Sequence, residues 1–302
     1  MNSLVQFLLK LVAFPNSYIL TCPLITYQGE IPPQIRLLTN LEVLRLGENR
    51  LNGSIPLEIG HLKSLVFLSL QFNDLHGCIP NSLGNLSNVA YLYPHNNQLS
   101  WSIPSEIGNL SNLIDVKMKI NYLTGPIPSS IGNLYQLKWL YIYQNQISGS
   151  ISPEIGNLPS LNSLCLQPNN LSGPIPSSLG ALSNLTFLYL DNNQLSGSIP
   201  PKIGNLSNLE FLSLGDNQFF GPIPQEIGNL GHLPWKYMEI LDLCFNMLQG
   251  PLPVPSLYTY FFSVSRNNLT REIPSLICNL SSLQYLDLSF KHLNNMIPVW
   301  DT

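Results

Sequence analysis

The side chains that most often carry catalysis are scattered along this chain. Its five histidines have no spacing that suits a Ser-His-Asp triad or a metal site; they are His61, His76, His95, His232 and His292. Its five cysteines include no CxxC pair and match neither a zinc site nor a disulfide framework; they are Cys22, Cys78, Cys165, Cys244 and Cys278. We therefore predict that the chain is not an enzyme and uses no metal or cofactor.

Aromatic and charged side chains, in contrast, recur in groups whose starts are 24 residues apart, or twice that. The members of each group are two residues apart, which places them on one face of an extended strand. Exposed aromatic rings beside charges are typical of binding hot spots, and the lysines would meet a ligand's carboxylate. The candidate ligand-binding residues are Tyr91, Tyr93, His95, Asp115, Lys117, Lys119, Trp139, Tyr141, Tyr143, Phe187, Tyr189 and Asp191.

A 24-residue repeat fixes the place of each of these side chains. The dipeptide Ile-Pro recurs with this step from Ile31-Pro32 to Ile223-Pro224, with Ser152 in place of one proline. Such internal periodicity is the signature of a repeat protein, in which each unit buries its apolar side against the next.

One unit, Leu185 to Pro200, shows how the positions divide. Leu188 and Leu190 share the inner face of a short strand, while their neighbours face outward. Asn193 belongs to a column of asparagines whose amides can satisfy buried backbone groups at the turn. Gly197 permits a positive φ, and the IGNLSNL segment that follows predicts a short helical return.

The outward strand positions form columns along the array. Aromatic residues in the first column, such as Tyr91 and Phe187, commonly shield a sheet from water. We therefore assign ligand contact mainly to the second and third columns. The residues expected to contact the ligand most directly are Tyr93, Lys117, Tyr141 and Tyr189.

The pattern LxxLxxLxLxxNxLxGxIPxxIGxL resembles the plant-specific class of extracellular leucine-rich repeats, over about Gly29 to Pro298. The resemblance implies an α/β repeat solenoid. Its expected form is a right-handed superhelix with a concave parallel β-sheet, short second strands, and 3-10 or helical turns on the convex side. This class includes receptor-like kinases, receptor-like proteins and soluble polygalacturonase inhibitors.

We expect residues 29–302 to form about eleven repeats, with an irregular insertion near 231–237. Residues 1–28 are either a degenerate N-terminal segment or the remnant of a signal peptide. The cysteine-paired caps of the family are not visible. Several positions of the repeat depart from its pattern; for example, Trp101 replaces a glycine and Pro94 replaces a core leucine. These departures favour a truncated receptor ectodomain or a decayed copy of one.

Eight Asn-x-Ser/Thr sequons are candidate N-glycosylation sites, which would suit an extracellular or cell-surface protein. Those in the IGNLSNL-type segments are expected on the convex side, where a glycan leaves the concave face open. The sequon asparagines are Asn52, Asn85, Asn109, Asn170, Asn184, Asn205, Asn268 and Asn279.

The low charge of the chain limits the kinds of partner that it can bind. Charged residues make up 10% of the chain and the net charge is −4, so a basic surface for nucleic acid is excluded. No apolar stretch reaches the roughly 18 to 20 residues of a membrane span.

These features favour the ectodomain of a plant receptor-like protein or kinase in defence or developmental signalling. It would bind a peptide, protein or glycan on its concave face, together with a co-receptor. The alternatives are a soluble inhibitor of a secreted cell-wall hydrolase and a non-functional receptor fragment.

Overall fold

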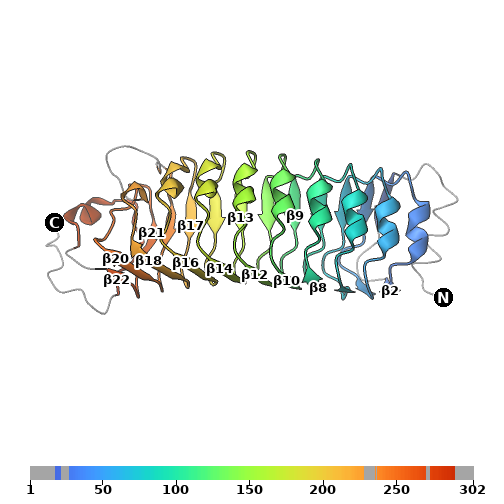
Figure 1. Cartoon of the computed structure of the whole chain (residues 1–302), viewed down its shortest axis with the longest axis horizontal. Helices are drawn as coiled ribbons and strands as arrows, with labels where there is room; N and C mark the ends of the chain where they lie inside the picture. The colour runs from blue at the N-terminus through green and yellow to red at the C-terminus, as the bar shows by residue number, and fades with distance from the viewer. Residues whose placement is uncertain (1–17, 22–26, 228–234, 236, 270–272, 290–302) are drawn as a thin grey trace. The chain divides into compact units, whose positions relative to one another are not determined.

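The computed structural model describes residues 18–21, 27–227, 235, 237–269 and 273–289. The chain forms two compact units, Met1–Ser148 and Gly149–Thr302. Each unit repeats one motif, in which a three-residue primary strand is followed by a short second strand and then a 3-10 turn (Figure 1).

In the first unit the primary strands pair in parallel, each in register with the strand one repeat later. They are β1 (Ile19–Thr21), β3 (Val43–Arg45), β5 (Phe67–Ser69), β7 (Tyr91–Tyr93), β9 (Asp115–Lys117) and β11 (Trp139–Tyr141). The second strands are β2 (Gln28–Glu30), β4 (Arg50–Asn52), β6 (His76–Gly77), β8 (Gln98–Ser102), β10 (Tyr122–Gly125) and β12 (Gln146–Gly149). The 3-10 turns are η1 (Pro33–Leu37), η2 (Leu57–His61), η3 (Asn81–Asn85), η4 (Ser105–Asn109) and η5 (Ser129–Asn133).

The second unit has the same organisation. Its primary strands are β13 (Ser163–Cys165), β15 (Phe187–Tyr189), β17 (Phe211–Ser213), β19 (Ile240–Asp242), β21 (Phe261–Ser263) and β23 (Tyr285–Asp287). Its second strands are β14 (Asn170–Gly173), β16 (Gln194–Gly197), β18 (Gln218–Pro222), β20 (Met247–Gly250) and β22 (Asn268–Leu269). Its 3-10 turns are η6 (Pro153–Asn157), η7 (Ser177–Ala181), η8 (Pro201–Asn205), η9 (Gln225–Ile227) and η10 (Ser275–Asn279).

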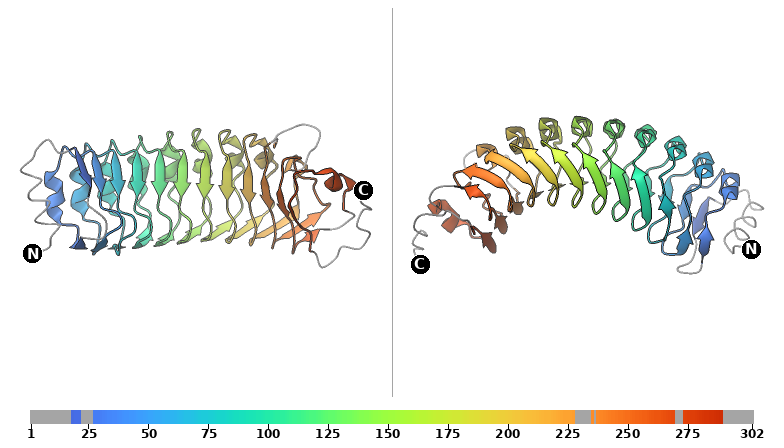
Figure 2. Two further views of the ribbon diagram at one scale, coloured as in Figure 1. Left: turned by 180° about the vertical axis from the view of Figure 1, so that it is seen from behind. Right: turned by 60° about the horizontal axis from the view of Figure 1, so that its bottom comes forward.

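Within each unit the 3-10 turns line one side and the primary strands another (Figure 2). The parallel primary sheet, the second strands and the 3-10 turns confirm the predicted leucine-rich-repeat solenoid. The strand β1 was not expected from the sequence, and it lies in the segment placed before the array. Most of the insertion near 231–237 lies outside the described residues, although Trp235 is described and buried.

The inward leucines form the core of each unit. Leu188, Leu190 and Leu195 are fully buried, and Ile199 is 1% exposed. Burying one such side chain contributes roughly 1.5–3 kcal/mol. Because the same positions repeat every 24 residues, every repeat adds a layer to this apolar column.

The asparagine column holds the turns that follow the primary strands. Asn121 is 7% exposed. Its Oδ1 accepts a hydrogen bond from the Leu99 N–H (2.9 Å), and its Nδ2 donates to the carbonyls of Pro94 and Met118 (both 3.2 Å). The amide thus links two successive repeats through backbone groups that would otherwise be buried without partners.

Two departures from the repeat have visible consequences. Pro94 has no N–H to donate to the next repeat, and the register between β7 and β9 has two residue pairs, Tyr91 with Asp115 and Leu92 with Val116. Trp101 stands where other repeats have a glycine, with φ of 68° and 70% of its surface exposed. A bulky side chain in this left-handed region is strained.

No helix among the described residues is long and apolar enough to cross a membrane.

Candidate ligand-binding surface

Three consecutive strands of the first unit bring the predicted groups together. Asp115 on β9 is the register partner of Tyr91 on β7 and of Trp139 on β11. The outward side chains on and just after these strands form what we call the aromatic–lysine patch. It consists of Tyr91, Tyr93, Lys117, Lys119, Trp139, Tyr141 and Tyr143, all partly exposed.

Two of the predicted contact residues, His95 and Asp115, are buried. His95 is 8% exposed and Asp115 is 6% exposed. Both lie beneath the patch and contact its side chains: Asp115 contacts Tyr93 and Lys117, and His95 contacts Tyr93. Because both are buried, a ligand on the patch would contact little of either side chain.

Asp115 organises one half of the patch. Its Oδ2 accepts a hydrogen bond from the Tyr93 hydroxyl at 2.7 Å and lies 3.1 Å from Lys117 Nζ. Lys117 Nζ also stands over the Tyr93 ring, 4.4 Å from its centroid. The three side chains therefore form a closed cluster, in which the charge of Lys117 is largely balanced by Asp115. Burial raises the pKa of Tyr93, and the hydrogen bond to Asp115 adds to the shift.

Lys119 and Tyr143 form the other half. Lys119 Nζ donates a hydrogen bond to the Tyr143 hydroxyl (2.8 Å) and lies 5.0 Å from the centroid of that ring. Among the described residues no carboxylate forms an ion pair with Lys119. Its charge is therefore available to an anionic group of a ligand, whereas that of Lys117 is already matched.

His95 lies below the patch as a neutral ring. Burial lowers its pKa most, and the charges of Lys119 and Lys117 lower it further, against the opposing effects of Asn96 and Asp115. His95 Nδ1 lies 2.9 Å from the Asn96 Oδ1. Because the neutral ring of His95 adds no charge, the positive charge of this surface comes from Lys117 and Lys119.

Phe67 also belongs to this surface, although the predicted ligand-binding residues do not include it. Its ring centroid lies 5.3 Å from that of Tyr93 and 5.7 Å from that of Tyr91, and Arg45 stands over it at 4.9 Å. The signal was present, because Phe67 stands 24 residues before Tyr91.

In the second unit, Phe187, Tyr189 and Asp191 lie on and just after β15. The Phe187 ring stacks on Phe211 with centroids 4.8 Å apart. Burial raises the pKa of Asp191, and the nearby Asp242 adds to this effect. This part of the sheet is therefore acidic where the aromatic–lysine patch of the first unit is basic.

The described residues contain no group of three or more His, Cys, Asp or Glu side chains that could hold a metal ion. Burial raises the pKa of the Cys244 thiol to about 12, with Asp242 adding to the shift, so this cysteine is a poor nucleophile near neutral pH.

All eight sequon asparagines are exposed. Asn85, Asn109, Asn205 and Asn279 are the last residues of η3, η4, η8 and η10. In each unit these positions are on the side of the 3-10 turns, away from the outward face of the primary strands.

Comparison with known proteins agrees with this architecture. The leucine-rich repeat region family matches residues 121–247, and the leucine-rich repeat family matches residues 40–62 and 64–86. Receptor-like protein 7 of Arabidopsis thaliana is 52% identical over 58 residues, which are 19% of this chain and 6% of that protein.

Several solved receptor structures resemble most of this chain. A TDR receptor is 33% identical with a TM-score of 0.81, and the match covers 87% of this chain and 45% of that one. The Arabidopsis receptor kinase HAESA, solved with the peptide hormone IDA and the co-receptor SERK1, is 30% identical with a TM-score of 0.78. That match covers 93% of this chain and 52% of HAESA, so this chain spans about half the length of the solved receptors. With these repeat families over residues 40–62, 64–86 and 121–247, the chain belongs to the leucine-rich-repeat proteins, and it is similar to plant receptor-like proteins and receptor ectodomains.

Proposed function

We propose that this chain is a ligand-binding part of the extracellular region of a plant receptor-like protein or receptor-like kinase, and that it acts by binding rather than by catalysis. The observation that carries the proposal is the aromatic–lysine patch on three adjacent strands. Partly exposed tyrosine, tryptophan and lysine side chains on a rigid sheet are the usual anchors of a protein interface.

An extended peptide is the ligand that this surface suits best. Its side chains would lie between the rings of Tyr93 and Tyr141, which stand on β7 and β11 with β9 between them. Its carboxylate would meet Lys119, whose charge has no ion-pair partner among the described residues, and Lys117 would join only by leaving Asp115. The bound state of HAESA, with a peptide hormone and a co-receptor, supports the same arrangement here, with signalling carried by a partner protein.

An extracellular location follows from the same proposal. In the first unit, the exposed sequons at the ends of η3 and η4 would carry glycans on the side opposite the binding surface. Such glycans would offset the low charge of the chain and leave the patch open.

Selection from a peptide library tests this proposal. A phage-displayed library of random dodecapeptides is selected on the whole glycosylated chain, and the enriched peptides are synthesised. Their affinity is then measured for the variant with alanine at Tyr93, Lys117, Tyr141 and Tyr189. A second variant keeps Tyr189, because that residue belongs to the other unit.

Both variants are expected to lose at least a hundredfold in affinity for the selected peptides. The matched control carries alanine at Tyr135 and Lys63, which lie on the side of the 3-10 turns, and should bind as the wild type does. Equal affinity of the wild type and the quadruple variant would contradict the proposal, as would a selection with no enrichment.

A further inference from the structure

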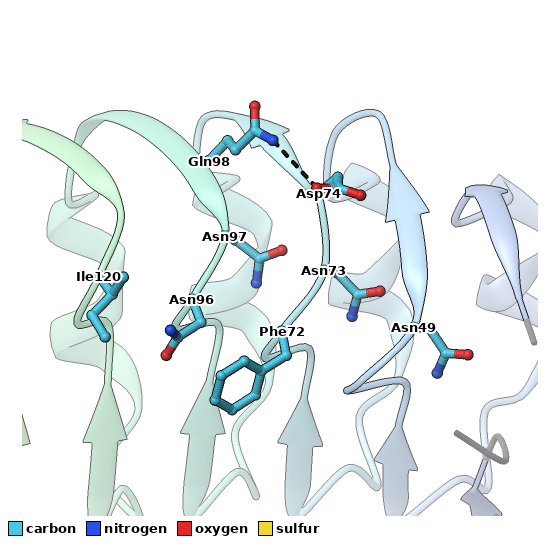
Figure 3. Close-up of a pocket in the computed structure, with 8 residues that line it drawn as sticks. All are labelled: Asn49, Phe72, Asn73, Asp74, Asn96, Asn97, Gln98 and Ile120. Atoms are coloured by element: carbon cyan, nitrogen blue, oxygen red, sulfur yellow. Dashed lines mark hydrogen bonds between the residues drawn. The ribbon is translucent and has the colours of Figure 1, made fainter. Parts of the chain in front are cut away.

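A second candidate site lies beside the aromatic–lysine patch, at the turns that follow the primary strands of the first unit. It is an open depression of about 400 Å³, which is within the size range of ligand pockets. The residues that line it are Asn49, Phe72, Asn73, Asp74, Asn96, Asn97, Gln98 and Ile120. Figure 3 shows Asn96 between the side chains of Phe72 and Ile120.

Two of the lining residues, Phe72 and Ile120, are apolar, which is unusual for their position in the repeat. Each directly precedes an asparagine of the asparagine column, and the backbone is left-handed there, with φ of 54° and 56°. The equivalent residues of the neighbouring repeats are polar, namely Glu48, Asn96 and Gln144. A bulky or β-branched residue is strained at positive φ, and strain of this kind concentrates at functional sites.

Phe72 presents an aromatic ring to the depression. It is 52% exposed, and the His95 ring meets it edge to face, with centroids 5.6 Å apart and planes at 83°. This contact holds the Phe72 ring in place without enclosing it. The ring is therefore a fixed apolar platform at the edge of a polar depression.

The polar groups of the depression divide into two sets. Asn73 and Asn97 belong to the asparagine column, and their side-chain amides point into the protein. They donate hydrogen bonds to backbone carbonyls there. In contrast, Asp74 and Gln98 are exposed and meet through a 3.4 Å hydrogen bond from Gln98 Nε2 to Asp74 Oδ1 (Figure 3). Asn96 binds His95 through its Oδ1, and its Nδ2 has no hydrogen-bond partner among the described residues.

We propose that this depression binds a neutral oligosaccharide. One face of a pyranose ring carries C–H groups and would lie on Phe72, while the hydroxyls at its rim both donate and accept hydrogen bonds. The Asp74 carboxylate accepts from such hydroxyls, and the amides of Asn96 and Gln98 donate to them. An apolar peptide side chain placed here would bury these polar groups without partners, which is unfavourable.

The charge of the site selects among saccharides. Asp74 is the one charged residue among those that line the depression, so a uronate would bring a second negative charge against it. A neutral saccharide meets no such repulsion. The site is thus distinct from the aromatic–lysine patch, which attracts anions.

The test measures binding of four neutral probes to the whole chain: cellohexaose, xylohexaose, mannohexaose and hexa-N-acetylchitohexaose. Hexagalacturonate is the anionic comparison. Saturation-transfer NMR detects contact, and calorimetry gives the dissociation constant. At least one neutral probe is expected to bind, with hexagalacturonate at least tenfold weaker.

Variants locate the site. Phe72→Ala should weaken the bound neutral probe at least tenfold, and Asp74→Asn, which keeps the shape of the side chain, several-fold. The matched control Tyr135→Ala removes a ring of similar exposure elsewhere in the unit, 59% against 52% for Phe72, and should have no effect. Binding should also survive alanine at Tyr93, Lys117 and Tyr141, since it does not depend on the proposed peptide site. Failure of all four neutral probes would overturn the proposal, and so would equal losses in Phe72→Ala and Tyr135→Ala.

Discussion

At the scale of single residues, this chain relies on polar side chains that serve the backbone. Asn121 of the asparagine column shows the principle, since its one amide satisfies backbone groups from two successive repeats. Its burial makes each of these bonds costly to lose, because the remaining partner is left unpaired away from water.

Asn121→Ala is therefore expected to destabilise the chain by about 3 kcal/mol. Urea unfolding followed by circular dichroism measures the change. The control is Asn112→Ala, whose side chain makes an exposed hydrogen bond to the Ser87 carbonyl and whose loss should cost less than about 0.5 kcal/mol. Similar midpoints for the two variants would contradict this account of the asparagine column.

His95 gives the first unit a dependence on pH. Since its pKa lies below the ordinary 6.5, the fold favours the neutral ring. This contribution to stability is present above about pH 6.5 and is lost as the pH falls through the lowered pKa. The urea midpoint should thus fall between about pH 7 and about pH 5, and the fall should be smaller in His95→Gln. His61→Gln replaces an exposed histidine and should keep the wild-type profile; a matching change in both variants would refute the assignment.

At the scale of elements, the second strands show what the repeat normally requires. Gly125 has φ of 69° at the position that Trp101 occupies one repeat earlier. Glycine adopts this conformation freely, whereas an L-residue with a side chain is strained there by about 1–2 kcal/mol.

Trp101→Gly should consequently stabilise the chain by about 1 kcal/mol, because the exposed indole contributes little packing in return. The reverse change, Gly125→Trp, is the matched test and should destabilise. Differential scanning calorimetry on both variants decides the matter. A lower melting temperature for Trp101→Gly would show that the indole makes a stabilising contact.

The elements also show how far the sequence alone could lead. The 24-residue step correctly predicts the primary strands, the asparagine column and a short helical return, because each depends on local spacing that repeats, whereas the second strands were expected only from the resemblance to leucine-rich repeats. Burial of His95 and Asp115 could not be predicted, since it depends on how neighbouring aromatic side chains such as Tyr91 and Tyr93 pack over them. The Phe72 depression was missed for a similar reason: it is formed by residues from four repeats, and three of them, Phe72, Asn96 and Ile120, project from left-handed positions.

At the scale of the whole molecule, each of the two units has one side formed by its primary strands and another, formed by its 3-10 turns, that is available for modification. Expression in a plant secretory host is expected to add glycans at Asn85, Asn109, Asn205 and Asn279. Enzymatic deglycosylation in heavy-oxygen water, followed by mass spectrometry, identifies the modified asparagines. If the secreted chain carries no glycan at any of these four, the extracellular assignment loses its structural support.

The central claim is that the ligand lies on the aromatic–lysine patch, and photo-cross-linking tests it most directly. A photoreactive benzoylphenylalanine replaces Tyr141 in one variant and Tyr135 in another, and each is irradiated with a peptide selected on the wild-type chain. Tyr141 is on β11 within the patch, and Tyr135 follows η5 on the other side of the unit. We predict a covalent adduct from position 141 and none from position 135. An adduct from position 135 alone would contradict the account.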